Sequence, residues 1–135
     1  MREHPIAIRW SDIDSYGHVN NAVYLNYLEE CRDRWIQGVM GAGFDFVIAR
    51  VAIDYRRELS LEDREVVVRC RGVGLGRSSI RTAEQVLAAG GWLAAEAESI
   101  VVAHDPVARA ARPLTPDERR TLEAAIASDA TPDGD

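Results

Sequence analysis

The N-terminal part of the chain changes from the apolar periodicity of a strand to that of a helix. Residues 5–10 alternate between apolar and polar side chains, which predicts a β-strand. From Asn21, apolar side chains recur at helical spacing in a stripe wider than that of a surface helix, so we expect other structure to wrap most of this helix. A glycine-rich stretch, 38–43, follows, and the helix is therefore expected to end near Met40.

The remainder of the chain has the pattern of antiparallel β-structure followed by one short helix. Four β-type stretches, joined by connectors short enough for hairpins, are residues 46–59, 64–75, 78–88 and 92–104. We expect them to form an antiparallel meander. Residues 115–127 predict a terminal helix, because Thr115 is a good N-cap and Pro116 and two acidic residues follow it. The last residues, 128–135, predict a disordered tail.

These elements define a single α+β domain over residues 1–127. A long helix lying in a curled antiparallel sheet is the natural way to bury so wide an apolar helix surface. The chain has 135 residues, of which 47% are hydrophobic. This length is sufficient for one hydrophobic core but is short for an enzyme with a buried pocket. A site shared between subunits would relieve that limit.

Composition excludes several classes of function. A formal net charge of −6 argues against non-specific binding to nucleic acid or to an anionic membrane, which both need an excess of cationic contacts. Cys31 and Cys70 lie far apart with no partner cysteines nearby, so a zinc site or a disulfide framework is not expected. Reduced thiols, together with the lack of a membrane-length apolar run or a signal-like segment, indicate a cytoplasmic protein.

The densest group of reactive side chains lies between the first strand and the long helix. Residues 12–24 read Asp-Ile-Asp-Ser-Tyr-Gly-His-Val-Asn-Asn-Ala-Val-Tyr. The N-terminus of a helix offers unpaired N–H groups and partial positive charge, which suit a developing oxyanion, and an aspartate beside it can act as base or nucleophile. This arrangement indicates acyl transfer.

Each of these residues also has a structural interpretation. Asp14 and its neighbour Asp12 could simply accept loop N–H bonds, and Asn20 or Asn21 could serve only as a helix cap. His18 is a candidate general acid or orienting donor, although loop histidines are often structural. The glycine-rich segment 72–76 imitates a dinucleotide-binding loop, but no helix follows it, which favours a bend at the end of a strand.

The loop and helix resemble the hotdog-fold acyl-CoA thioesterases of the 4-hydroxybenzoyl-CoA thioesterase type. The resemblance is carried by Asp14-x-x-Gly17-His18-Val19-Asn20-Asn21-x-x-Tyr24, and later pieces in the same order extend it over roughly residues 6–125. It implies the hotdog fold, α+β, with a long central helix wrapped by a five-stranded antiparallel sheet and a short C-terminal helix. It also implies that Asp14 is catalytic and that the backbone N–H of Asn21 holds the thioester oxygen. His18 would be auxiliary, and the site would lie at a dimer interface.

The resemblance also implies where the substrate binds. Arg77, Ser78 and Ser79 fall between two predicted strands, where the family places basic residues that meet the phosphates of coenzyme A. Arg56 and Arg57 are further candidates.

The expected activity is hydrolysis of an acyl thioester of coenzyme A, or of acyl carrier protein, by a homodimer or homotetramer without a metal or organic cofactor. Two alternatives stay open. A hotdog hydratase or dehydratase for enoyl thioesters would pair an aspartate with a histidine several residues on, although the residues around Asp14 match hydratases poorly. A non-catalytic acyl-binding module would use the same pocket without cleaving the thioester.

Overall fold

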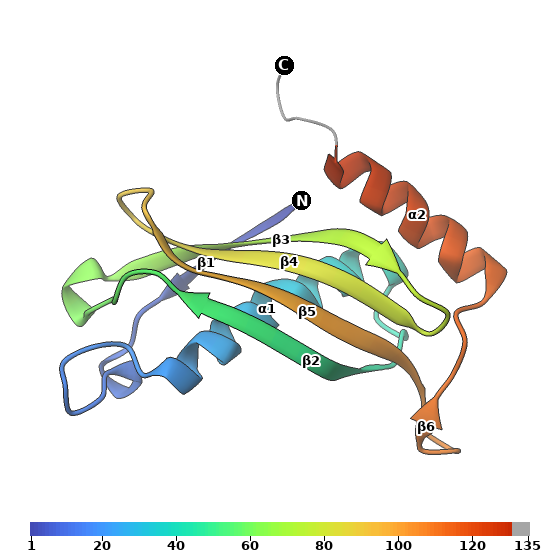
Figure 1. Ribbon diagram of the computed structural model, residues 1–135, viewed down its shortest axis with the longest axis horizontal. Helices are drawn as coiled ribbons and strands as arrows, with labels where there is room; N and C mark the ends of the chain where they lie inside the picture. The colour runs from blue at the N-terminus through green and yellow to red at the C-terminus, as the bar shows by residue number, and fades with distance from the viewer. Residues whose placement is uncertain (131–135) are drawn as a thin grey trace.

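A computed structural model describes residues 1–130 and shows a long helix lying across one face of a curled antiparallel sheet (Figure 1). The helices are α1 (Asn21–Met40) and α2 (Pro116–Ala130). The strands are β1 (Arg2–Ala7), β2 (Phe46–Tyr55), β3 (Glu65–Leu75), β4 (Ser79–Ala88), β5 (Leu93–Asp105) and β6 (Ala110–Ala111). Two short 3-10 turns, Trp10–Asp12 and Leu61–Asp63, precede α1 and β3.

The sheet has the order β1-β3-β4-β5-β2, and each neighbouring pair is antiparallel. Within residues 1–130 it has six strands instead of the predicted five, because the two-residue strand β6 pairs with the end of β5. The predicted meander is therefore correct for β3, β4 and β5 but wrong for β2, which pairs with β5 at the far edge instead of with β3. The segment from 56 to 64 is a crossover. Leu59 in this crossover is completely buried, and its C=O accepts a 2.8 Å hydrogen bond from Val19 N, just before α1. The crossover thus passes beside the loop that carries the candidate catalytic residues.

Helix α1 has the predicted bounds because both of its ends are chemically specified. Asn20 is the N-cap, and its side chain accepts a 2.9 Å hydrogen bond from Ala22 N. At the other end Gly41 has a φ of +85°, a conformation that favours glycine, and its N–H reaches the C=O of Gln37. The helix packs over β1, β3 and β4. The side chains that it buries are Tyr24, Tyr27, Leu28, Cys31, Arg32, Trp35 and Ile36.

The first strand begins and ends earlier than predicted. It spans Arg2–Ala7, whereas residues 8 to 10 leave the sheet and Trp10 is 81% exposed at the start of a 3-10 turn. The physical reason is the Asp12 carboxylate, which accepts hydrogen bonds from the backbone and guanidinium of Arg9 and draws the chain into a turn. Alternation of apolar residues continues through this turn, so periodicity alone does not locate it.

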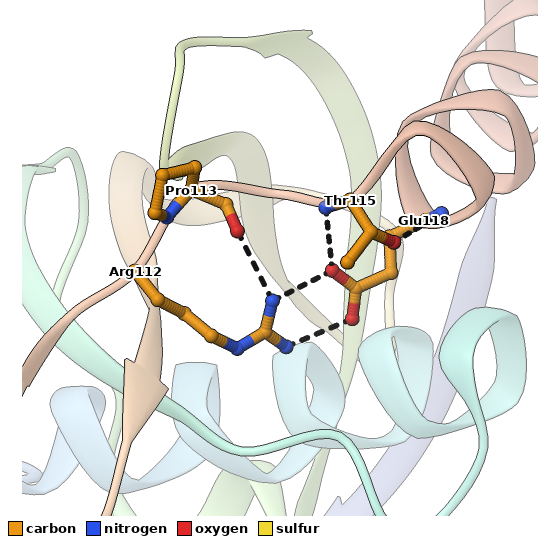
Figure 2. Close-up of polar contacts among 4 residues, drawn as sticks. All are labelled: Arg112, Pro113, Thr115 and Glu118. Carbon is orange, nitrogen blue, oxygen red and sulfur yellow. Dashed lines mark hydrogen bonds and ion pairs between the residues drawn. The ribbon is translucent and has the colours of Figure 1, made fainter. Parts of the chain in front are cut away.

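The terminal helix α2 is anchored by a capping box (Figure 2). Thr115 Oγ1 accepts from Glu118 N, and the Glu118 carboxylate accepts from Thr115 N. Both terminal guanidinium nitrogens of Arg112 also donate to Glu118, at 2.7 and 2.8 Å. The predicted cap at Thr115 and the predicted proline at the first turn are therefore confirmed.

At its other end α2 runs to Ala130, so the prediction of a tail from residue 128 was wrong for 128–130. Asp129 in this last turn accepts 2.9 Å hydrogen bonds from Trp35 Nε1 and Gly72 N, which fix the helix end to α1 and β3. Positions 131–135, the rest of the predicted tail, lie outside the described residues. The interpretation of the segment 72–76 as a bend is confirmed, because the β3–β4 register shifts between Gly72 and Gly74.

Replacing Glu118 by glutamine should lower the free energy of unfolding by about 1–3 kcal/mol at pH 7. The Arg112 guanidinium holds the pKa of this carboxyl at about 2, well below its ordinary value of 4.5. A lowered pKa stabilises the fold above the unfolded-state value, and that contribution disappears as the pH falls from about 4.5 towards 2. Urea unfolding of both proteins across this pH range measures the effect.

The matched control is Glu123→Gln, a substitution of an exposed carboxylate on the same helix, for which a change within about 0.5 kcal/mol is expected. If the difference between wild type and Glu118→Gln were independent of pH, the ion pair would not be its origin.

Candidate active site

A short closed loop connects the first 3-10 turn to α1. Its ends are joined by an isolated bridge between Ile13 and Val19 and by a 2.9 Å hydrogen bond from Asp14 N to His18 O. Inside the loop Gly17 donates its N–H to the C=O of Asp14 and has a φ of +84°, which a residue with a side chain rarely adopts. The loop therefore fixes the position of Asp14 relative to the start of α1.

The two carboxylate oxygens of Asp14 differ in their surroundings. Oδ1 accepts hydrogen bonds from the backbone N–H groups of Tyr16, at 2.9 Å, and His18, at 3.4 Å. Oδ2 has no donor within residues 1–130. Such an Asx-type turn orients the carboxylate through one oxygen and leaves the other free to bind a proton or attack a carbon atom.

The start of α1 presents an unpaired backbone donor. Of the two candidate N-cap residues, Asn20 is the one that caps the helix. Asn21 is the first helical residue. The N–H of Asn21 has no acceptor in the described part of the chain. It lies at the positive end of a helix of 20 residues, where orphan N–H groups favour negative charge.

These groups meet in a pocket of about 460 Å³. The structure brings together in it most of the predicted site residues, namely Asp14, His18, Asn21, Arg56 and Arg57. Its other lining residues are Tyr16, Val19, Tyr24, Tyr55 and Glu58.

Tyr55, which sequence reasoning did not single out, connects β2 to this pocket. Its hydroxyl donates a 2.9 Å hydrogen bond to the C=O of Asn21, and its ring packs edge-on against Tyr24 with centroids 5.2 Å apart. Burial raises the pKa of Tyr24 to about 12, so this phenol stays protonated at neutral pH. The signal in the sequence was the segment 54–57, one of the later pieces of the family resemblance, in which Tyr55 immediately precedes the two candidate arginines.

Arg77, Ser78 and Ser79 do not join this pocket in the same chain. They lie at the β3–β4 turn, which is at the opposite end of the sheet from the loop of residues 13–20 (Figure 1). There the C=O of Arg77 accepts from Leu114 N, and that of Ser78 accepts from Ala103 N.

Asp12 is the rival carboxylate, and its position agrees with the structural interpretation. It is 1% exposed and accepts hydrogen bonds from Tyr27 Oη at 2.8 Å, Arg9 N at 2.9 Å and Arg9 Nη2 at 2.8 Å. Burial acts to raise its pKa, but the hydrogen bonds from Arg9 and Tyr27 outweigh burial and bring the pKa below its ordinary value. Both oxygens are occupied, so Asp12 holds the loop instead of serving a substrate.

Among residues 1–130 no group of three or more histidine, cysteine or acidic side chains could hold a metal ion. Cys31 and Cys70 are buried free thiols, and burial raises the pKa of Cys31 to about 11. Neither of the two described helices is long and apolar enough to cross a membrane.

A carboxylate with one free oxygen, placed in one pocket with an orphan N–H at a helix N-terminus, has the chemistry that an acyl-transfer site requires. Comparison with known proteins agrees. The profile of the thioesterase-like superfamily matches residues 8–123. FadM, a long-chain acyl-CoA thioesterase of Escherichia coli (strain K12), is 31% identical over 126 residues, covering 87% of this chain and 94% of FadM. The chain therefore belongs to the thioesterase-like superfamily.

Solved structures place the fold in the same class. A thioesterase from Thermus thermophilus, solved in complex with coenzyme A and Zn, is 36% identical, with a TM-score of 0.81 over 93% of this chain and 95% of that chain. A predicted thioesterase from Bacillus stearothermophilus is 22% identical and has a TM-score of 0.83 over 93% of this chain and 96% of that one. The hotdog fold implied by the sequence is thus confirmed.

Proposed function

We propose that the protein is an enzyme that hydrolyses acyl thioesters of coenzyme A to a free acid and a thiol. The observation that carries the proposal is the pairing of the free Oδ2 of Asp14 with the unpaired N–H of Asn21 in one pocket. The activity named for FadM, and the coenzyme A bound by the Thermus thermophilus protein, support this substrate class.

In this mechanism the carbonyl oxygen of the thioester binds at the N–H of Asn21. As the carbonyl carbon becomes tetrahedral, negative charge grows on that oxygen and is stabilised by the N–H group and by the positive end of α1. Tyr55 supports this geometry, because its hydrogen bond to the C=O of Asn21 ties the first helical turn to β2. The His18 imidazole lines the same pocket as an auxiliary donor.

Asp14 has two routes to product. As a general base it takes a proton from water, whose oxygen attacks the carbonyl carbon; the C–S bond then breaks, and the thiolate recovers the proton from Asp14. As a nucleophile Asp14 itself displaces the thiolate to give a mixed anhydride, which water hydrolyses. Both routes use only protein groups and water, and coenzyme A enters as part of the substrate.

Purified protein incubated with a panel of acyl-CoA thioesters and a free-thiol reagent tests the proposal. Thiol release supports hydrolysis. Loss of enoyl absorbance without thiol release would indicate the hydratase alternative, and binding without either change would indicate an acyl-binding module. Including acyl carrier protein thioesters in the panel identifies the preferred carrier.

We further propose that the working unit is a homodimer, or a tetramer of two such dimers, with each pocket closed by the partner subunit. Strand β2 is an edge strand of 10 residues, and Val47, Ile48 and Tyr55 on it are 42%, 48% and 45% exposed. Helix α1 packs over the other half of the sheet and leaves β2 largely uncovered. A small domain gains burial by pairing such an edge with a copy of itself. In that arrangement Arg77, Ser78 and Ser79 act in the partner's pocket.

Light scattering at micromolar concentration should therefore give a mass at least twice the 14.9 kDa of one chain. Ile48→Arg should shift this mass towards that of one chain and lower kcat/KM by at least about tenfold, because it places an unpaired charge in an apolar interface. Val107→Arg is the matched control, since Val107 is 92% exposed and lies on the turn after β5 instead of on the edge strand β2. A monomer that is fully active over the working concentration range would contradict the shared site.

A further inference from the structure

Two arginines follow Tyr55 in the pocket, and their surroundings differ. The guanidinium of Arg56 is neutralised by carboxylates, with Glu96 at 2.7 Å and Asp54 at 3.7 Å. The guanidinium of Arg57 instead lies over the ring of Trp92, 4.2 Å from its centroid, and forms no ion pair within residues 1–130. Arg57 is therefore the cation of this pocket that has no carboxylate partner among the described residues.

The stacked contact leaves Arg57 ready to bind an anion. A guanidinium carbon over an indole ring is attracted by the π face of the ring, and this contact supplies no carboxylate or other anion to the N–H donors of the guanidinium. The platform itself is firmly held, because Trp92 packs against the hydrophobic core and its C=O accepts a 2.9 Å hydrogen bond from Ala88 N. Arg57 N donates to the C=O of Ala94 at 3.1 Å, which fixes the backbone of the arginine to the same hairpin.

We propose that Arg57, held on Trp92, is the anchor for a phosphate ester in the carrier part of the substrate. This inference rests on the proposed thioesterase function and adds a positioning residue, Trp92, outside the sequence motifs. The Cα of Arg57 lies at most about 7 Å from that of Tyr55 along the chain, and the hydroxyl of Tyr55 contacts the first turn of α1. Asn21 and Arg57 also line the same pocket of about 460 Å³, so one ligand can contact Asn21 through its thioester and Arg57 through a phosphate. Coenzyme A and the phosphopantetheine of acyl carrier protein both have this chemistry.

Arg57→Gln and Trp92→Leu test the anchor, with Arg71→Gln as a control for loss of an exposed arginine outside the pocket. Calorimetric titration with free coenzyme A should give a Kd raised about tenfold or more in Arg57→Gln, since a charge-assisted phosphate contact is lost. Trp92→Leu should raise it by less, and Arg71→Gln should leave it unchanged.

Kinetics with a truncated substrate separate an anchor from a general effect on the fold. For an acyl-CoA, Arg57→Gln and Trp92→Leu should both raise KM and change kcat less than about twofold, because the contact is remote from the reacting carbon. For the matching acyl-pantetheine, which has no phosphate, KM should equal that of the wild type. Equal loss with acyl-pantetheine would overturn the proposal and assign Arg57 and Trp92 a purely structural role.

Further results show which phosphate of the carrier is bound and which arginine binds it. A raised KM for acyl carrier protein thioesters as well as for acyl-CoA supports contact with the phosphate next to pantetheine, whereas an effect on acyl-CoA alone supports contact with the nucleotide phosphates. If Arg77→Ala weakens binding of coenzyme A and Arg57→Gln does not, the anchor proposal is wrong. If Arg57→Gln weakens binding of coenzyme A but no thioester is cleaved by the wild type, the anchor stands and the proposed function fails.

Discussion

Replacing Asp14 by asparagine should lower kcat by at least about 100-fold while the protein remains folded and assembled. The amide oxygen of asparagine still accepts the N–H groups of Tyr16 and His18, so the loop keeps its shape. What disappears is the free carboxylate oxygen, and an amide can neither take a proton from water at neutral pH nor attack a thioester. Thiol release under saturating substrate measures kcat, and circular dichroism with light scattering verifies the fold and the assembly.

The control variant for Asp14→Asn is His18→Ala. The backbone amide of His18 remains in place in this variant, and only the imidazole in the pocket is lost. We expect a reduction of about tenfold or less, because a thiolate leaves without prior protonation. A folded Asp14→Asn protein with near-normal turnover would remove Asp14 from the mechanism.

Asp12→Asn should produce the opposite pattern, with a loss of about 2–4 kcal/mol in stability and a small change in kcat per folded molecule. Its carboxylate is 1% exposed and receives charge-assisted hydrogen bonds from Arg9 together with the hydroxyl of Tyr27. An asparagine at this position turns an NH₂ group towards one of these donors. Because the pKa of Asp12 is lowered, its contribution exists above the unfolded-state pKa and is lost as the pH falls. Thermal and urea unfolding at neutral and acidic pH measure both effects.

Tyr27→Phe is the graded control for Asp12, since it removes one donor and keeps the charge and the packing of the ring. A loss of about 1 kcal/mol is expected. If Asp12→Asn reduced kcat more than Asp14→Asn did in folded protein, the catalytic role would belong to Asp12.

An element of this fold could be predicted from the sequence where local signals specify its ends, and could not where long-range contacts decide its position. Helix α1 was predicted with its true bounds because a cap residue and a glycine specify its ends. The position of β2 could not be predicted, since alternation along a strand says which face is buried but not which neighbour it pairs with. The crossover around Leu59 is decided by a long-range contact with Val19, and no local pattern encodes that contact.

The same limit applies to the site. Asp14, His18 and Asn21 were found together because they are close along the chain, and the closed loop keeps them close in space. Arg57 and Trp92 are separated along the chain by β3 and β4, so their stacking was not foreseeable. Arg77 was the stronger candidate by motif, and it stays a candidate only through a second copy of the chain.

The two outer strands of the sheet also determine how far assembly can proceed. Strand β1 carries Pro5, which has no N–H to offer a neighbouring chain, and β2 has a bulge between Ile48 and Arg50 that interrupts a flat ladder. Pro5 therefore makes the β1 edge resist strand addition, and in the proposed dimer a single two-fold contact would occupy the β2 edge. If the proposed dimer forms, growth by edge pairing would terminate at two chains, and the apolar strand that favours a closed pair would not seed a filament.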